Sequence, residues 1–399
     1  MGSVAPKQYK GIIVDREARH LKPDKGVVLS ESPQKIYRVY DALGSVGEII
    51  AEYGAKHPFL VCGSSARRFP LWGNMVDSIG ELTVFSNFGP NPTYDSVVEG
   101  AELFKSNGCD FLISIGGGSA MDVAKAVKLF SAMDDGCDYL TQSHKPSNVV
   151  HLAVPTTAGT GSESTAFSVI YRDGDKKSLE NPVMIPDIVL LDAALLATLP
   201  EYQKKCAFLD AMGQCIESIW AVGANDESQD YAQTGLKLLL EYADGYFRGD
   251  VFAAQQVHLA ANFSGRAINI SKTTAAHAMS YGITALCKIP HGHAVAMALP
   301  VVWQELLVKM DKGNTQNTNT KSIYLALDRI DRCFGAFSHT SALSAYLAVY
   351  KGLSLARPAI EPDQIIQLAQ TVNLQRLKNM PVQFSQDEIH KMYNQIFYR

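Results

Sequence analysis

Short apolar segments alternate with segments of helical length through the first part of the chain. The apolar segments cover residues 58–62, 82–85, 111–115 and 149–154. A glycine or proline directly follows three of them. Residues 46–53 and 96–106 have the length and spacing of helices. Because near-continuous apolar strands are typical of a parallel sheet covered by helices on both faces, we predict a Rossmann-like α/β domain over residues 1–195.

The remainder of the chain has a helical pattern, with few β-branched runs and few turn clusters. Helices are expected at residues 201–221, 227–247, 251–270, 274–285, 293–310 and 323–353. The polar stretch 313–320 is expected to be a mobile loop. We predict that residues 196–399 form an all-helical second domain.

Composition and charge exclude several classes of protein. With 47% hydrophobic residues and a formal net charge of −4, the chain is neither disordered nor a strongly basic nucleic-acid binder. No apolar run approaches the ~18–20 residues of a transmembrane helix, and the N-terminus lacks the apolar core of a signal peptide. The seven cysteines are scattered without a Cys-x-x-Cys pair, which fits a reducing compartment. We expect a cytoplasmic protein with no nucleic-acid or membrane partner.

Two polar loops follow predicted strands. Gly116, Gly117, Gly118 and Ser119 open a helix, so the backbone can approach a pyrophosphate and the free N–H groups of the helix can bind it. The spacing is not Gly-x-Gly-x-x-Gly, and a tight strand–helix turn is the alternative. Residues 155–163, Pro-Thr-Thr-Ala-Gly-Thr-Gly-Ser-Glu, also follow a strand, where open α/β folds bind ligands. The alternative is a capped connection into a further strand, but the two loops together indicate one dinucleotide groove.

Four side chains of the predicted helical domain form a possible metal site. Asp210 and Gln214 are four residues apart, which puts both oxygens on one helix face. His277 and His291 would lie ~21 Å apart on one helix, but Pro290 breaks the helix and Gly282 weakens it, so the chain can turn. A carboxylate, an amide oxygen and two imidazoles suit a divalent metal ion. The alternative is hydrogen-bonded core histidines beside a common Asp/Gln spacing.

Taken in order, five motifs resemble the iron-containing (group III) metal-dependent alcohol dehydrogenases over about residues 30–310. The motifs are Gly-Pro-Asn-Pro-Thr at 89–93, Gly-Gly-Gly-Ser-Ala-Met-Asp at 116–122, the loop 155–163, Asp-Ala-Met-Gly-Gln at 210–214, and His277 with Pro-His-Gly at 290–292. The resemblance implies a dinucleotide-binding domain, a helical domain, and a cleft between them that holds nicotinamide and a metal ion. It also implies a homodimer.

The resemblance assigns roles to individual residues. It implies that the cofactor phosphates lie along Gly117, Gly118, Ser119 and Asp122. It places Thr156 and Thr157 along the cofactor. It also assigns Thr165 and Lys177 to the cofactor site, in a region where the resemblance to the family is weaker. It implies that the metal ligands are Asp210, Gln214, His277 and His291. Fe²⁺ is the expected ion, with Zn²⁺ and Mn²⁺ as alternatives.

Two positions depart from the family pattern. Gln214 stands where most members have histidine, which exchanges an imidazole for a harder, weaker amide oxygen. Tyr281 stands where many have a second histidine, and it is a catalytic candidate that either bonds the substrate oxygen, passes a proton or only packs. Both departures look similar to a subgroup that reduces phosphonoacetaldehyde or sulfoacetaldehyde. Lys272 and Lys288 flank this segment and either hold the anionic head of such a substrate or are surface lysines.

Gly63 ends the first strand of the predicted dinucleotide domain, where members that reject a 2′-phosphate often carry an acidic residue. Ser64, Ser65, Arg67 and Arg68 follow it. We therefore expect NADPH to be accepted and NADH not to be excluded. The function predicted is a metal-dependent, NAD(P)H-linked reductase that interconverts a small aldehyde and its primary alcohol by hydride transfer. The alternatives are a polyol or glycerol-type dehydrogenase, a sugar-phosphate cyclase relative, and a nucleotide-binding scaffold whose metal site has decayed.

Overall fold

The computed structural model describes residues 34–312, 320–374 and 376–398, and the predicted mobile loop at 313–320 lies almost wholly outside them. The chain divides into two compact units. The first contains the described residues through Thr156 and the segment Thr165–Thr198. The second contains Thr157–Ser164 and the described residues from Leu199 onward. The division after Thr198 is close to the expected boundary at residue 195, but the sequence pattern does not indicate that Thr157–Ser164 belongs with the helical unit.

A six-stranded, fully parallel sheet forms the centre of the first unit, in the order β1-β8-β5-β4-β2-β3. Its strands are β1 (Lys35–Val39), β2 (Pro58–Cys62), β3 (Thr83–Phe85), β4 (Phe111–Gly116), β5 (Val150–Pro155) and β8 (Ile188–Asp192). A separate antiparallel hairpin consists of β6 (Phe167–Arg172) and β7 (Asp175–Glu180). The predicted α/β fold with a parallel sheet is confirmed.

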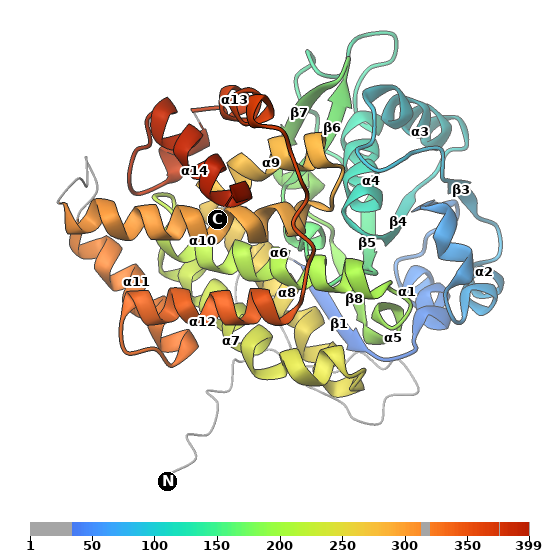
Figure 1. The fold of residues 1–399 in the computed structure, drawn as a ribbon. Helices are drawn as coiled ribbons and strands as arrows, with labels where there is room; N and C mark the ends of the chain where they lie inside the picture. Colours follow the sequence, from blue (N-terminus) through green and yellow to red (C-terminus); the bar gives the residue numbers. More distant parts are fainter. Residues whose placement is uncertain (1–33, 313–319, 375, 399) are drawn as a thin grey trace. The chain divides into compact units, whose positions relative to one another are not determined.

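Short helices connect the strands of this unit. The α-helices are α1 (Val46–Glu52), α2 (Trp72–Ile79), α3 (Tyr94–Ser106), α4 (Gly118–Ser131) and α5 (Ala193–Leu196) (Figure 1). The 3₁₀ helices are η1 (Leu43–Ser45), η2 (Ser64–Arg68) and η4 (Pro182–Met184). A further 3₁₀ helix, η3 (Ser162–Ser164), lies in the segment Thr157–Ser164, which belongs to the second unit.

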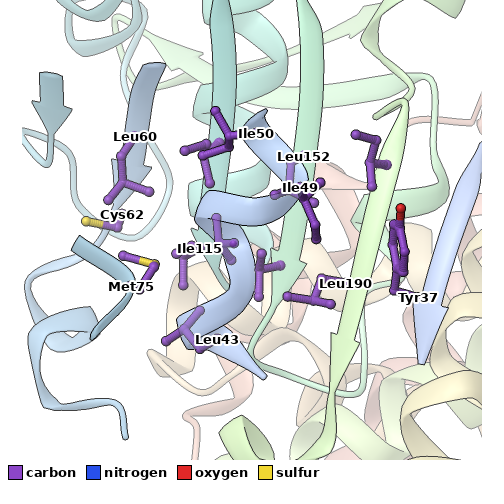
Figure 2. Close-up of a cluster of buried hydrophobic side chains, with 14 of the residues drawn as sticks. Tyr37, Leu43, Ile49, Ile50, Leu60, Cys62, Met75, Ile115, Leu152 and Leu190 are labelled. Atoms are coloured by element: carbon purple, nitrogen blue, oxygen red, sulfur yellow. The ribbon is translucent and has the colours of Figure 1, made fainter. Parts of the chain in front are cut away.

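Alternate residues of the strands pack into two separate apolar cores, one on each face of the sheet. On β2, Leu60 and Cys62 belong to the core that also contains Ile49 of α1 (Figure 2). Phe59 and Val61 belong to the other core, which contains residues of α3 and α4. All four side chains of this strand are at most 3% exposed. Burial on both faces explains why these strands have continuous rather than alternating apolar sequence.

The described part of the second unit is helical, as predicted. Its long helices are α6 (Glu201–Trp220), α7 (Asp226–Phe247), α8 (Val251–Ser271), α9 (Ala275–Cys287), α10 (His291–Asp311), α11 (Thr320–Phe334), α12 (His339–Gly352), α13 (Pro362–Thr371) and α14 (Gln386–Tyr398). A 3₁₀ helix, η5 (Arg376–Asn379), precedes α14. No helix among the described residues is long and apolar enough to cross a membrane.

The single helix expected at residues 323–353 is wrong, because two helices occupy this range. Gly335 follows α11 with φ of +61°, a conformation that glycine adopts readily. Ser338 then caps α12, and its side chain and that of Ser341 each bond the backbone N–H of the other in a capping box. These two local signals override the continuous helical pattern.

Candidate active site

Helix α6 carries three buried polar side chains on one face. Asp210, Gln214 and Glu217 are spaced by four and then three residues, which places them along one stripe of the helix. They are 3%, 4% and 0% exposed, respectively. Buried carboxylates are stable only when hydrogen bonds or opposite charges compensate them, so this stripe must have partners.

His277, on α9, lies between the two carboxylates of α6. Its Nε2 is 3.4 Å from Oδ1 of Asp210, and its Nδ1 is hydrogen-bonded to the carboxylate of Glu217. Within the described part of the chain, neither Asp210 Oδ1 nor His277 Nε2 has a hydrogen-bond partner, and both atoms are buried. Such orphaned atoms are rare in proteins and require an explanation.

His291 is the first residue of α10, and its Nε2 is 4.0 Å from Asp210 Oδ1. The chain reverses between α9 and α10 because Lys288 adopts a left-handed conformation, with φ of +55°, and Pro290 precedes the new helix. The expected turn at Pro290 is therefore present. Gly282 does not contribute to it, since α9 continues through this residue.

The role of Gly282 is to admit a neighbouring helix. A Cβ atom at this position would lie 2.9 Å from Oγ1 of Thr371, the last residue of α13. Gly282 was predicted to weaken the helix. In the structure, its lack of a side chain instead allows α13 to pack closely against α9.

The three convergent donors fit a divalent cation. One ligand atom from each of Asp210, His277 and His291 lies within 4.8 Å of the others. Two donors that are each about 2.1 Å from a tetrahedrally coordinated ion lie about 3.4 Å apart, which is the separation of Asp210 Oδ1 and His277 Nε2. A carboxylate with two imidazoles suits Fe²⁺, Zn²⁺ or Mn²⁺.

Charge in this cluster is balanced by mutual interactions. Burial alone would raise the pKa of Asp210, but His277 and His291 outweigh it and hold that pKa below its usual value. Burial alone would lower the pKa of His277, but Glu217 and Asp210 outweigh it and raise the pKa to about 9. The two buried carboxylates thus favour positive charge at His277 Nε2, where a metal ion would replace the proton.

Glu217 contacts the candidate site, and the sequence analysis missed it. Its carboxylate accepts hydrogen bonds from the Thr274 hydroxyl, from the backbone N–H of Ala276 at 2.8 Å, and from His277 Nδ1. It therefore both caps the start of α9 and orients the imidazole. The available signal was its spacing, since residue 217 falls on the same helix face as residues 210 and 214.

The carboxamide of Gln214 is held by two hydrogen bonds. Its Nε2 donates to the carbonyl oxygen of Thr160 at 3.3 Å, and its Oε1 accepts from the Ser264 hydroxyl at 2.8 Å. The structure places Gln214 one turn after Asp210 on the same face of α6. Its role as a metal ligand stays a prediction.

Tyr281 lies one turn after His277 on α9. Its ring stacks on that of His291, with centroids 5.3 Å apart and an interplanar angle of 11°. The ring centroids of His277 and His291 are 5.4 Å apart in an edge-to-face arrangement. Tyr281 therefore contacts the donor cluster through its ring, and a catalytic role for its hydroxyl stays a prediction.

The two lysines considered as anion-binding residues lie on either side of α9. Lys272 is the residue after α8, and its Nζ donates to the Asn269 carbonyl at 3.4 Å. Lys288 is exposed in the turn before α10. Both have positive φ, which ends the preceding helix in each case.

In the first unit, β4 leads through Gly116 and Gly117 directly into α4, as predicted. A Cβ atom at Gly116 would lie 2.7 Å from Cβ of Ala120, so this position admits only glycine without rearrangement. The N-cap residue of α4 is Gly117, which has no side chain to cap the helix. The first N–H groups of this 14-residue helix, including that of Ser119, therefore remain suited to an anion.

Of the other predicted cofactor residues, Thr156 contacts this turn, whereas Thr157, Gly63 and Lys177 lie apart from it. Thr156, at the end of β5, donates its backbone N–H to the Gly116 carbonyl at 2.9 Å, whereas Thr157 belongs to the second unit. Gly63 follows β2 and is the N-cap residue of η2. Lys177 lies on β7, where its Nζ is 3.4 Å from Asp175.

Asp122 and Thr165 take part in the packing of α4 against the hairpin. The Asp122 carboxylate accepts from the backbone N–H of Val169 at 3.2 Å. The Thr165 hydroxyl accepts from Nζ of Lys125 at 2.7 Å, and this lysine is fully buried. These contacts give both residues a structural role, and contact with a cofactor stays a prediction for each.

A cavity of about 450 Å³ in the first unit lies beyond the end of β3. Gly89 and Thr93 of the Gly-Pro-Asn-Pro-Thr motif line it together with Asn87, Asp95 and Glu99. Because two carboxylates line this cavity, it is a poor site for a pyrophosphate.

A second group of possible metal ligands lies at the junction of α11 and α12. It consists of Asp328, Asp331 and His339. His339 Nδ1 is 2.6 Å from an Asp331 carboxylate oxygen, so a hydrogen bond explains this contact without a metal.

Comparison with known proteins identifies the family. The model of the iron-containing alcohol dehydrogenases matches residues 33–193, and that of the C-terminal part of the same family matches residues 206–397. The NADPH-dependent butanol dehydrogenase of Clostridium saccharobutylicum is 30% identical over 275 residues, which are 66% of this chain and 71% of that protein. The phosphonoacetaldehyde reductase of Streptomyces viridochromogenes is 34% identical over 243 residues, which are 56% of this chain and 60% of that protein.

A solved structure has the same fold. The sulfoacetaldehyde reductase from Bifidobacterium kashiwanohense, in complex with NAD⁺, aligns with a TM-score of 0.81 at 24% identity, over 92% of this chain and 97% of that one. With the two family models and the butanol dehydrogenase relative, these matches cover both units. The chain belongs to the iron-containing alcohol dehydrogenase family and is an oxidoreductase of the alcohol dehydrogenase class.

Proposed function

We propose that this protein uses NAD(P)H and one divalent cation to interconvert a small aldehyde with an anionic head and its primary alcohol. The observation that carries the proposal is the pair of buried, orphaned atoms, Asp210 Oδ1 and His277 Nε2, with His291 beside them. When bound, the cation would supply Lewis acidity at the carbonyl oxygen, and the nicotinamide would supply or accept the hydride.

The residues of the chain would position these groups and exclude water. Asp210, His277 and His291 would hold the cation with Gln214, while Glu217 keeps the proton on Nδ1 of His277 and so leaves Nε2 as the donor. Asp210 and His277 are nearly fully buried, whereas the side chain of His291 is 33% exposed. We expect the aldehyde to approach, and a proton to reach its oxygen, from this exposed side.

The first unit would bind the dinucleotide at the N-terminus of α4. The uncapped N–H groups there would face the pyrophosphate, and the end of β2 would approach the adenosine ribose. Gly63 offers no negative charge to repel a 2′-phosphate, and η2 carries Arg67 and Arg68. We therefore propose that NADPH is accepted, without selection against NADH.

The anionic head is supported by the relatives and by charge near the donor cluster. A phosphonoacetaldehyde reductase is among the relatives and a sulfoacetaldehyde reductase among the structures with the same fold. Lys272 lies close to His277 in sequence and is partly buried, whereas Lys288 is exposed. Of the two lysines, Lys272 is the better candidate to meet a sulfonate or phosphonate.

The test is to measure NADH and NADPH oxidation with sulfoacetaldehyde, phosphonoacetaldehyde and propanal. Each rate is measured on chelator-treated protein and after addition of Fe²⁺, Mn²⁺ or Zn²⁺. Metal-dependent turnover that favours an anionic aldehyde supports the proposal. If kcat/KM for propanal equals that for the two anionic aldehydes, the part of the proposal that requires an anionic head is wrong. Oxidation of glycerol in preference to reduction of any aldehyde would favour a polyol dehydrogenase. Nucleotide binding without turnover with any metal would overturn the proposed activity.

A further inference from the structure

The carboxamide of Gln214 has only one orientation that satisfies its neighbours. The Thr160 carbonyl oxygen, 3.3 Å away, can only accept a hydrogen bond, so the amide atom that faces it must be the nitrogen. The amide oxygen then faces Ser264, whose hydroxyl is 2.8 Å away. The same hydroxyl lies 2.8 Å from the Ala261 carbonyl oxygen, so its single proton is shared between the two acceptors. The Thr160 contact alone therefore fixes which end of the carboxamide is the oxygen.

Both anchors are themselves held rigidly. The loop that carries Thr160 packs against α8 by direct backbone contact, since a Cβ atom at Gly265 would lie 2.2 Å from the Gly161 carbonyl oxygen. Asn262 of α8 donates to the Ser164 hydroxyl in the same loop at 2.7 Å. Ser264 lies on α8 and is fully buried. The Thr160 carbonyl therefore cannot turn away without disrupting the packing between this loop and α8.

The oxygen of Gln214 retains a lone pair after it accepts from Ser264, because an amide oxygen has two. Gln214 is 4% exposed and lies on the stripe of α6 that already supplies Asp210 to the donor cluster. His277 lies against this stripe, bonded to Glu217 at one ring nitrogen and 3.4 Å from Asp210 at the other. Gln214 is therefore placed between the two residues that contact His277.

We propose that Thr160 and Ser264 are positioning residues that orient Gln214 as an oxygen donor to the cation, and that this donor shifts the metal preference toward Mn²⁺. The inference rests on the proposed function, because it requires a cation at Asp210, His277 and His291. Carbonyl and carboxylate oxygens suit Mn²⁺, whereas imidazole nitrogen strengthens binding of Zn²⁺. A site with two oxygen and two nitrogen ligands therefore discriminates less against Mn²⁺, relative to Zn²⁺, than a site with one oxygen and three nitrogen ligands.

The test compares the wild type with Gln214→His. A histidine keeps one N–H for Thr160 and one lone pair for the cation, so it exchanges the donor atom and preserves the hydrogen bond. Dissociation constants for Mn²⁺ and Zn²⁺ are measured on metal-free protein by chelator competition. We expect Gln214→His to raise the ratio of the Mn²⁺ constant to the Zn²⁺ constant at least tenfold. The visible spectrum of the Co²⁺-loaded protein should shift as well, which provides a readout independent of activity.

Two serine variants test the positioning role. Ser264→Ala should weaken binding of both ions several-fold and alter the Co²⁺ spectrum. Ser271→Ala is the matched control, because Ser271 is also buried on α8 and bonds Ser218 rather than Gln214. Gln214→Glu places a carboxylate oxygen against the Thr160 carbonyl, so it should lower the melting temperature of the metal-free protein.

The outcomes separate this inference from the proposed function. If the wild type binds one Co²⁺ per chain but Gln214→His changes neither the spectrum nor the ratio of constants, Gln214 is not a ligand. The inference then fails, whereas the cation site of Asp210, His277 and His291 and the proposed activity stand. Equal effects of Ser264→Ala and Ser271→Ala would also overturn it. If the wild type binds no Co²⁺ stoichiometrically, the metal site of the proposed function fails as well.

Discussion

Glu217 accepts a hydrogen bond from Nδ1 of His277, on the side of the ring opposite to Asp210. Burial alone would raise the pKa of Glu217, but His277, Thr274 and the Ala276 N–H outweigh it and hold that pKa below its usual value. Glu217 is therefore ionised and can only accept, so Nδ1 must carry the proton. When His277 is neutral, its lone pair therefore lies on Nε2, which faces Asp210.

Glu217→Gln should weaken metal binding by about 10- to 100-fold, the usual effect of removing a carboxylate that supports a metal-binding histidine. The glutamine keeps an acceptor for Ala276 but loses the negative charge that makes the imidazole a stronger donor. The dissociation constant of Zn²⁺, measured by chelator competition, checks this. His339→Ala is the control, because the ion pair of His339 with Asp331 is expected to hold no metal. An unchanged constant in Glu217→Gln would limit Glu217 to capping α9.

Gly116→Ala should raise the dissociation constant of NADPH at least tenfold. The added Cβ would approach Cβ of Ala120 to 2.7 Å, so the turn that leads into α4 must shift and its N–H groups must move. Gly108→Ala is the matched control, because Gly108 has φ of +58° and no atom within 4 Å of the added Cβ. The control should lose stability through backbone strain but bind NADPH normally. Fluorescence titration of both variants checks the prediction, and equal constants for the two would contradict the assignment of the α4 turn.

Three of the four strands predicted from the sequence, at residues 58–62, 111–115 and 149–154, are the interior strands β2, β4 and β5, which are almost entirely buried. The fourth, at residues 82–85, is the edge strand β3, in which Val84 is 41% exposed. Strand β8 is fully buried but was not predicted, and β1, with Lys35 and Arg38, lies at the other edge and has no continuous apolar run. The hairpin strand β7 is polar and has no buried residue, so its sequence resembles a loop. An apolar run therefore favours an interior strand but does not identify every strand of the sheet.

The candidate site was predictable only in part from local sequence. The spacing of Asp210 and Gln214 on a helix was sufficient to place both on one face. The convergence of His277 and His291 depends on a left-handed Lys288, and lysine gives no signal for that conformation. Only the resemblance to a family linked these residues. The bonds that Gln214 makes with Thr160 and Ser264 depend on tertiary packing, which no spacing in the sequence indicates.

His151 should make the protein less stable in mild acid. Burial lowers the pKa of its imidazole well below 6.5, and the charges of Lys128 and Lys125 add to this effect. Below pH ~6.5 the unfolded chain binds a proton at this residue that the folded chain does not, so the free energy of unfolding decreases as the pH falls. One proton contributes at most ~1.4 kcal/mol per pH unit. His151→Gln should have a smaller decrease between pH 6.5 and 5.5, as measured by urea unfolding, and identical decreases would contradict the prediction.

Tyr281→Phe should retain metal binding and at least half of kcat/KM. The ring of Tyr281 stacks on His291, whose side chain is the most exposed of the three convergent donors, so the stacked ring restricts the imidazole. Phenylalanine preserves this contact, whereas Tyr281→Ala removes it and should weaken Zn²⁺ binding several-fold. Dissociation constants for Zn²⁺ check the predicted effect on metal binding in both variants, and steady-state rates check the predicted effect on kcat/KM. If Tyr281→Phe instead binds Zn²⁺ normally but loses a hundredfold in kcat, the hydroxyl transfers a proton to or from the substrate oxygen, and the stacking is only its support.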